Sequence, residues 1–360
     1  MKRLLVMLIL ALAIAAPACA EEMDGDVVYT LVDQSGAVLT MRGGRMYEGD
    51  EYISSDDQLY RIVSVDDQRM TATAEHLGYA ETDPAAATAF ASLIARAESK
   101  KKVAMYSTHS DESYVPTDGT ESKLKDAGIY DVGDALKENL EKLGIEVEYS
   151  KDTFHPHDAG AYRRSRRTAE ELLKAAPDAI FDIHRDAIPA EQYETEVEGE
   201  DTSKVRLFVG RSNPNGDENR AFARQIKAVA DKQYPGLVKD IFIGKGNYNQ
   251  ELYPRALLLE MGTHEIEKEK AISSTQYIAE VINEVLYGGT AKAEASSGRQ
   301  AKTVSSGIIW VIGAVIVAAV VYALASSGKL KDIWPKVKRS TSEITGGIVG
   351  DKPEKKAGKK

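Results

Sequence analysis

The sequence predicts an α/β fold: a largely parallel sheet with helices on both faces, preceded by a small β domain and followed by one transmembrane helix. Three patterns in the 360 residues predict it. From residue 103 onward, short apolar runs alternate with amphipathic segments of helical period, as in strands joined by crossover helices. Residues 27–78 contain clusters of β-branched and aromatic residues between turns. An uncharged apolar run near the C-terminus has the length of a bilayer span.

The elements of the α/β region are expected in a regular order. Strands are expected over residues 103–106, 145–147, 179–183, 205–209 and 256–259, and helices over residues 132–143, 161–175, 219–233 and 271–287. Strands that are apolar over their whole length are typical of a parallel sheet covered on both faces. We therefore assign residues 102–287 to one domain.

The segment before this domain predicts β structure. Strands are expected over residues 27–31, 37–41 and 59–63, with turns at residues 33–36 and 43–44. We assign residues 25–80 to a small β domain, in which no chemical motif occurs. The alanine-rich residues 81–101 are expected to form a linker.

The N-terminus predicts export. Lys2 and Arg3 precede an apolar run, and Ala18-Cys19-Ala20 supplies small residues for cleavage, so residues 1–20 are expected to be a signal peptide. Lipidation of Cys19 is the alternative. Because Cys19 is the only cysteine, cleavage after Ala20 would leave a mature chain without disulfides.

The C-terminus predicts a membrane anchor. Residues 288–306, rich in Ala, Ser and Gly, are expected to be a flexible stalk, residues 307–325 a transmembrane helix and residues 326–360 a basic tail. Because cationic flanks mark the cytoplasmic side, the catalytic domain is expected outside the cell membrane and the tail in the cytoplasm. The rest of the chain must be acidic to give the overall net charge of −10, which argues against nucleic acid as a partner.

Two histidines and a glutamate follow or end three of the predicted strands. His109 and His184 follow the first and the third, and Glu260 ends the last. Carboxyl ends of parallel strands lie along one rim of a sheet, where ligands bind. Imidazole and carboxylate groups suit Zn²⁺, which lowers the pKa of a bound water. Glu260 is the expected general base, with a pKa raised by the apolar strand before it.

The third zinc ligand is left open by the residues alone. Glu112 follows His109 in a His-x-x-Glu spacing that some zinc peptidases use, Glu121 lies in the loop before the first helix, and Asp111 is a further candidate. Arg185 is expected to polarise a carbonyl or to orient His184.

Other polar residues are weaker candidates. His155 and His157 are expected to contact substrate or to form structural hydrogen bonds, and His264 could replace one zinc histidine. The mature chain has no cysteine, and neither a G-x-S-x-G elbow nor a glycine-rich phosphate loop occurs.

Five blocks of the sequence, in order, resemble the stage II sporulation protein P family. They are STHSDESYVP (107–116), DTFHPHDAGAYRRS (152–165), FDIHRDAIP (181–189), QYPGL (233–237) and YNQELYPRALLLEMG (248–262). The resemblance covers residues 100–287 and implies a zinc amidase-like fold. It also implies a zinc-dependent N-acetylmuramoyl-L-alanine amidase that removes stem peptides from peptidoglycan glycan strands in sporulation and engulfment. Endopeptidase cleavage of cross-links is also associated with the family.

The same resemblance implies particular residue roles and partners. His109 and His184 match the zinc histidines, and Glu260 matches the catalytic glutamate. Related amidases carry the ligand glutamate in the loop before the first helix, so we favour Glu121 over Glu112. The expected partners are peptidoglycan and the stage II sporulation proteins D and M. Familiar members are anchored near the N-terminus, whereas the span expected here is C-terminal. A zinc carboxypeptidase or endopeptidase of wall peptides, or an inactive wall-binding scaffold, are the alternative functions.

Overall fold

The computed structural model describes residues 27–80 and 101–288. The expected signal peptide, transmembrane helix and basic tail lie outside these ranges, as do nearly all of the expected linker and stalk. Of the helices within them, none has the length and apolar character needed to cross a membrane.

A sheet of 11 strands organises the described residues, in the order β2-β1-β5-β4-β3-β12-β11-β13-β8-β6-β7. Six of these strands belong to the α/β part: β6 (Lys102–Tyr106), β7 (Glu146–Tyr149), β8 (Ala179–Asp186), β11 (Val205–Gly210), β12 (Val238–Gly244) and β13 (Ala256–Thr263). Neighbours among these six run parallel, except that β11 and β13 are antiparallel. The expectation of a mixed α/β fold with a mostly parallel sheet is therefore confirmed for this part.

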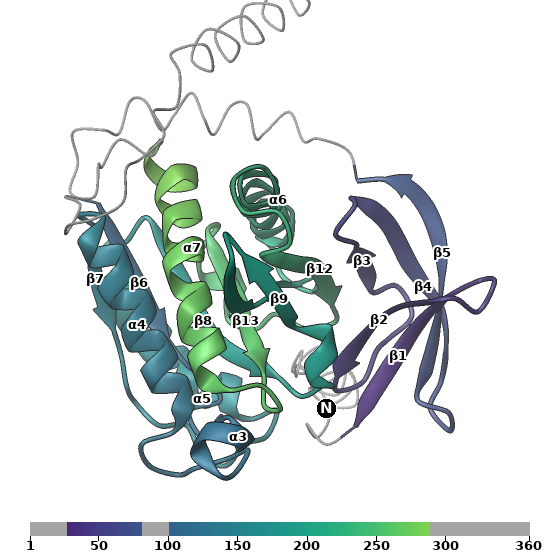
Figure 1. Ribbon diagram of the computed structural model, residues 1–360, viewed down its shortest axis with the longest axis horizontal. Helices are drawn as coiled ribbons and strands as arrows, with labels where there is room; N and C mark the ends of the chain where they lie inside the picture. Colours follow the sequence, from purple (N-terminus) through teal and green to yellow (C-terminus); the bar gives the residue numbers. More distant parts are fainter. Residues whose placement is uncertain (1–26, 81–100, 289–360) are drawn as a thin grey trace, which may run out of the picture. The chain divides into compact units, whose positions relative to one another are not determined.

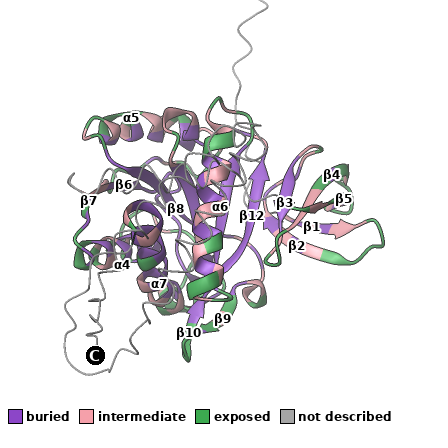
Figure 2. Ribbon diagram, turned by 90° about the horizontal axis from the view of Figure 1, so that it is seen from above, coloured by how far each residue is buried: buried purple, intermediate pink, exposed green. Residues whose placement is uncertain are grey.

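Helices cover both faces of this sheet. They are α4 (Gly128–Lys142), α5 (Ala161–Leu173), α6 (Gly216–Gln233) and α7 (Lys268–Tyr287). On one face α4, α6 and α7 pack over the largest apolar cluster, and α4 lies beside α7 (Figure 1). Helix α5 covers β6 and β8 from the other face (Figure 2).

The apolar spacing of α4 shows why these segments form helices that pack in this way. Ile129, Val132, Leu136 and Leu140 recur at intervals of three or four residues and are fully buried, which gives one apolar stripe along the helix. The helix ends just before Gly144, whose φ of 78° favours glycine. The chain then turns directly into β7.

The N-terminal strands do not form a separate sheet. They are β1 (Val28–Asp33), β2 (Val38–Gly43), β3 (Glu51–Ile53), β4 (Gln58–Asp66) and β5 (Thr71–Tyr79). Strand β3 pairs antiparallel with β12, where Ile53 lies opposite Ile241. Tyr29 and Leu31 pack in one apolar cluster with Phe208 and Phe242 of the α/β part. The β segment expected over residues 25–80 thus extends the sheet and covers part of the face that α5 leaves open.

Four short elements complete the description: the one-turn helix α3 (Val115–Asp118), the hairpin of β9 (Glu194–Val197) and β10 (Glu200–Ser203), and the 3₁₀ turns η1 (Ala190–Gln192) and η2 (Gln250–Leu252). Helix α3 lies in the loop between β6 and α4, the loop that also carries His109 and Glu112.

Candidate metal centre

Strands β8 and β13 bring two of the expected site residues together. Glu260 on β13 pairs with His184 on β8 in parallel register. Because directly paired residues in a sheet point to the same face, the two side chains are neighbours. Both strands continue past the apolar runs seen in the sequence, so His184 and Glu260 lie within strands and not just beyond them.

The loop after β6 brings the third expected residue, His109, to the same place. Thr108 donates from its backbone N–H and its hydroxyl to the two oxygens of Asp182, at 2.8 and 2.7 Å. Asp182 lies on β8 two residues before His184 and is buried. This anchor places the His109 ring 4.9 Å from the His184 ring, measured between centroids.

Glu112 lies between the two imidazoles. Its Oε1 is 3.4 Å from Nδ1 of His109 and 3.4 Å from Nδ1 of His184. Bonds of about 2.0–2.2 Å to a tetrahedral zinc ion separate two ligand atoms by roughly 3.3–3.5 Å. Both measured spacings match the edge of such a tetrahedron, so the residues present fit a zinc ion.

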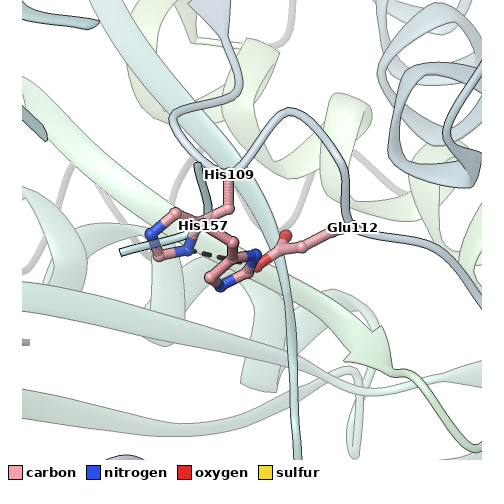
Figure 3. A group of neighbouring side chains, drawn as sticks. All are labelled: His109, Glu112 and His157. Atoms are coloured by element: carbon pink, nitrogen blue, oxygen red, sulfur yellow. Dashed lines mark ion pairs between the residues drawn. The ribbon is translucent and has the colours of Figure 1, made fainter. Parts of the chain in front are cut away.

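His157 joins this group from the segment between β7 and α5. One ligand atom from each of His109, Glu112 and His157 lies within 4.8 Å of the others (Figure 3). Its ring stacks on that of His109 at 3.9 Å between centroids. From the sequence, His157 is expected only to contact substrate or to form structural hydrogen bonds, because its spacing from the other residues carries no ligand signature.

Carboxylates and a backbone amide hold three of these groups in orientation. Nε2 of His184 lies 2.9 Å from Oδ1 of Asp182, so its Nδ1 is the atom that faces Glu112. Oε2 of Glu112 accepts from the backbone N–H of Arg185 at 2.9 Å, so its Oε1 faces the imidazoles. Nδ1 of His157 lies 3.1 Å from Oδ1 of Asp111. Such outer contacts fix the tautomer and direction of metal ligands.

Glu121 lies apart from the imidazoles. Its side chain is exposed, while its backbone carbonyl accepts from the N–H of Ser113 and from Arg185. The loop turns back after Glu112, with Glu112 bridged to Ser122, and this turn directs Glu121 to solvent. Of the two glutamates considered, the structure brings only Glu112 to the histidines.

Arg185 holds the loop that carries Glu112. Its guanidinium donates to the carbonyl oxygens of Ser113 and Glu121, at 3.2 and 2.8 Å. The side chain is buried and engaged with backbone. The structure thus gives Arg185 a positioning contact with the Glu112 loop.

Burial and charge shift the pKa values of the group. Burial alone would lower the pKa of His184, but the Asp182 and Glu112 carboxylates outweigh it and raise that pKa well above its usual value. Burial alone would raise the pKa of Glu112, but His184 and His109 hold it well below the usual range. Glu112 therefore stays negatively charged beside the imidazoles, and this charge favours binding of a cation.

Glu260 has the surroundings expected of a general base. It is the one β13 residue that retains partial exposure, yet its Oε2 is buried and has no hydrogen-bond partner among the described residues. Burial, with a further contribution from the nearby Asp186 charge, raises the pKa of Glu260 to about 8. The sequence also predicts a raised pKa for Glu260.

A buried ion network lies beside Glu260 and includes the N-terminal strands. Arg206 pairs with Asp186 at 2.8 Å and with Asp240 at 2.6 Å. Its Nη2 also donates to the hydroxyl of Thr40 on β2, at 2.7 Å. Arg42 of the same strand lines a small pocket together with Glu260. Strand β2 therefore forms part of the wall of the candidate site.

The remaining histidines of this region have other contacts. Nε2 of His155 lies 3.2 Å from the carbonyl of Leu124, and Nδ1 of His264 lies 3.3 Å from the Thr263 hydroxyl. Neither belongs to the three-residue group of ligand atoms found among the described residues.

Comparison with known proteins identifies the family. The family model for stage II sporulation protein P matches residues 43–283, more than half of the chain. A curated relative, stage II sporulation protein P of Bacillus subtilis strain 168, is 31% identical over 222 residues. That alignment covers 56% of this chain and 55% of the relative, so the chain spans about half the length of the curated relative that it matches.

Two solved structures have a similar arrangement over about half of the chain. One is an N-acetylmuramoyl-L-alanine amidase from Clostridium difficile 630, at 16% identity and a TM-score of 0.34, covering 52% of this chain and 95% of that one. The other is the CwlD amidase from Clostridioides difficile in complex with the GerS lipoprotein, at 14% identity and a TM-score of 0.35, covering 53% and 96%.

The family match agrees with the resemblance of the five sequence blocks and extends it toward the N-terminus. It begins at Gly43, and so it also includes β3, β4 and β5. The chain belongs to the stage II sporulation protein P family.

Proposed function

We propose that this protein is a zinc-dependent N-acetylmuramoyl-L-alanine amidase that removes stem peptides from cell-wall peptidoglycan during sporulation. One observation carries the proposal: a single oxygen of Glu112 lies 3.4 Å from both His109 and His184, at the spacing of zinc ligands. Oε2 of Glu260, which is buried without a hydrogen-bond partner among the described residues, lies on the strand next to His184. Membership of the family supports the link to sporulation.

Each residue has a role that follows from its contacts. His109, Glu112 and His184 would hold the metal, and Asp182 orients His184. A zinc ion supplies Lewis-acid activation of water and of a scissile carbonyl when it is bound. Glu260 would accept a proton from water and return it to the leaving amine.

The raised pKa of Glu260 bears on this role. A group that must both accept and release a proton works best with a pKa near the working pH. Burial raises the pKa of Glu260 to about 8, and a cation at the neighbouring cluster would favour its charged form. Burial raises the pKa of Glu260 and the cation lowers it, so together they bring this pKa toward neutral pH.

The positions of His109 and Glu112 also favour a second candidate, a zinc carboxypeptidase or endopeptidase of wall peptides. The His-x-x-Glu pair supplies two neighbouring ligand atoms from one loop, a spacing that zinc peptidases share. Both activities would use the same metal and the same base, so the difference lies in which bond of the substrate is cut.

Mass spectrometry of digested peptidoglycan distinguishes these functions. The amidase releases intact stem peptides and leaves glycan without peptides, and a chelator abolishes the reaction. Shortened stems that remain attached to glycan would reject the amidase in favour of the peptidase. Absence of any cleavage by a zinc-loaded chain would favour the wall-binding scaffold.

We further propose that this activity is exerted outside the cell membrane, with a C-terminal span and the stage II sporulation proteins D and M as partners. The apolar residues 307–325 and the cationic residues after them support the anchor. Protease treatment of intact cells tests it: a tag on residue 360 should survive and the domain at residues 102–287 should be digested.

A further inference from the structure

His157 lies against the candidate metal ligands although no motif in the sequence links it to them. Its imidazole stacks on that of His109, with the ring planes 25° apart and the centroids 3.9 Å apart (Figure 3). It offers a ligand atom within 4.8 Å of those of His109 and Glu112. His157 is thus close enough to His109 and Glu112 to share a metal ion with them.

The contact between His157 and Asp111 is of the kind that metal-binding histidines make. Its Nδ1 lies 3.1 Å from Oδ1 of Asp111, which leaves Nε2 as the available nitrogen. The same arrangement occurs at His184, where Asp182 engages one nitrogen and the other faces Glu112. A carboxylate on the outer nitrogen of a histidine is typical of zinc sites.

The segment that carries His157 is held in place from two sides. The backbone N–H of Phe154 donates to the hydroxyl of Ser110, at 2.9 Å, and Ser110 follows His109 directly. From α5, Nε of Arg164 donates to the carbonyl of Phe154 at 2.7 Å, and Nη2 of Arg164 donates to the carbonyl of Pro156. The backbone just before His157 is therefore held by Ser110 and by Arg164.

We infer that His157 is a fourth protein ligand of the metal in the resting enzyme, through Nε2. This inference rests on the proposed zinc centre and adds to it. A tetrahedral zinc ion with four protein ligands has no position left for water, whereas a catalytic site keeps one open. One ligand must then leave before the reaction.

Exposure indicates which ligand leaves. The His157 side chain is 29% exposed, against 6% for His109, 3% for Glu112 and 2% for His184. The protein thus encloses three of the four ligands. Of the four, only the His157 ring is exposed enough to rotate into solvent. Rotation of the His157 ring into solvent would open the fourth position of the metal.

X-ray absorption at the zinc edge tests the inference on the full chain loaded with one equivalent of zinc. The wild type should show three imidazole ligands and His157→Ala should show two. His155→Ala is the matched control, because His155 lies in the same segment and contacts the Leu124 carbonyl instead; it should keep three.

Zinc affinity, measured by competition with a chelator, gives a second readout. His157→Ala and His157→Gln should bind zinc at least about tenfold more weakly than wild type, and Asp111→Asn should shift affinity in the same direction. Far-UV circular dichroism checks that each variant is folded. Two imidazoles in both wild type and His157→Ala, with unchanged affinity, would overturn the inference and leave the proposed function intact. A chain that binds no zinc at all would overturn both.

Discussion

Glu260 and His184 occupy directly paired positions on the parallel strands β13 and β8, so their side chains stand next to each other on one face of the sheet. This places a carboxyl group of raised pKa beside a group of side chains spaced as zinc ligands. The register between the two strands thereby determines the distance between Glu260 and His184. Any shift in that register would move Glu260 away from the candidate metal ligands.

Glu260→Gln should separate catalysis from metal binding. The amide keeps the shape of the side chain but cannot accept a proton, so we expect normal zinc content and a loss of peptidoglycan hydrolysis of about 10²–10⁴-fold. Dye release from labelled peptidoglycan and elemental analysis measure the two properties. Glu265→Gln, an exposed site just after β13, is the control and should hydrolyse normally. Normal turnover by Glu260→Gln would refute the base assignment.

Glu112→Gln and Glu121→Gln should differ in metal binding although both lie in one loop. Glu112 contacts both imidazoles, whereas the Glu121 side chain is exposed. We therefore expect Glu112→Gln to lose bound zinc, as His109→Ala and His184→Ala should, and Glu121→Gln to retain it. Elemental analysis after gel filtration measures zinc per chain. The reverse pattern would restore Glu121 as the ligand.

The stability of the metal-free protein should depend on pH through Glu260. Burial raises the pKa of Glu260 from 4.5 to about 8. Between these values the folded state holds a proton that the unfolded state has released, so the free energy of unfolding should fall as pH rises through this window. Glu260→Gln removes this titration and should make the fall shallower by up to roughly 1.4 kcal/mol per pH unit.

Urea unfolding of chelator-treated protein at several pH values between 4.5 and 8 measures this slope. Wild type and Glu260→Gln share the other titrating groups, so the difference between their profiles reports the titration of Glu260 together with its effect on the neighbouring His184 and Glu112. Parallel profiles for the two proteins would show that the Glu260 carboxyl group has an ordinary pKa.

Thr40→Val should destabilise the fold although Thr40 lies in the N-terminal β segment. Its hydroxyl accepts from Arg206 and from Lys239, each at 2.7 Å, inside the protein. Valine leaves each of these buried donors with one hydrogen-bond partner fewer, which should lower the free energy of unfolding by about 1–3 kcal/mol. Urea unfolding followed by far-UV circular dichroism measures it.

Thr71→Val is the matched control, because the Thr71 hydroxyl makes an exposed contact to the carbonyl of Arg69. It should change the free energy of unfolding by less than about 0.5 kcal/mol. Equal effects of the two substitutions would mean that the contact between β2 and Arg206 does not stabilise the fold.

Strongly periodic parts of the fold could be predicted from the sequence. The apolar stripe of α4 and the continuous apolar runs of β8 and β13 identify these elements, with boundaries that shift by a few residues. Strand β12 could not be found in this way, because Lys239 and Asp240 suggest a surface segment. Lys239 and Asp240 pair with each other, Asp240 also pairs with Arg206, and Lys239 donates to the hydroxyl of Thr40. Arg206 and Thr40 are distant from them in sequence.

The candidate site could be predicted only in part. The sequence predicts that His109, His184 and Glu260 lie close together, because each is expected near the carboxyl end of a strand and such ends lie along one rim of a parallel sheet. The choice between Glu112 and Glu121 depends on how a loop turns, and sequence spacing does not determine that. His157 reaches the site through a segment held by Arg164 and Ser110, and such side-chain contacts leave no periodic signal in the sequence.

The proposed function requires that side chains far apart in the sequence bind one zinc ion on this face of the sheet. Anomalous diffraction at the zinc absorption edge, from crystals of the zinc-loaded chain, would locate that ion. We expect one strong peak within bonding distance of His109 Nδ1, Glu112 Oε1 and His184 Nδ1, with Glu260 close by but not bound. A peak elsewhere, or none at all, would rule out this zinc site.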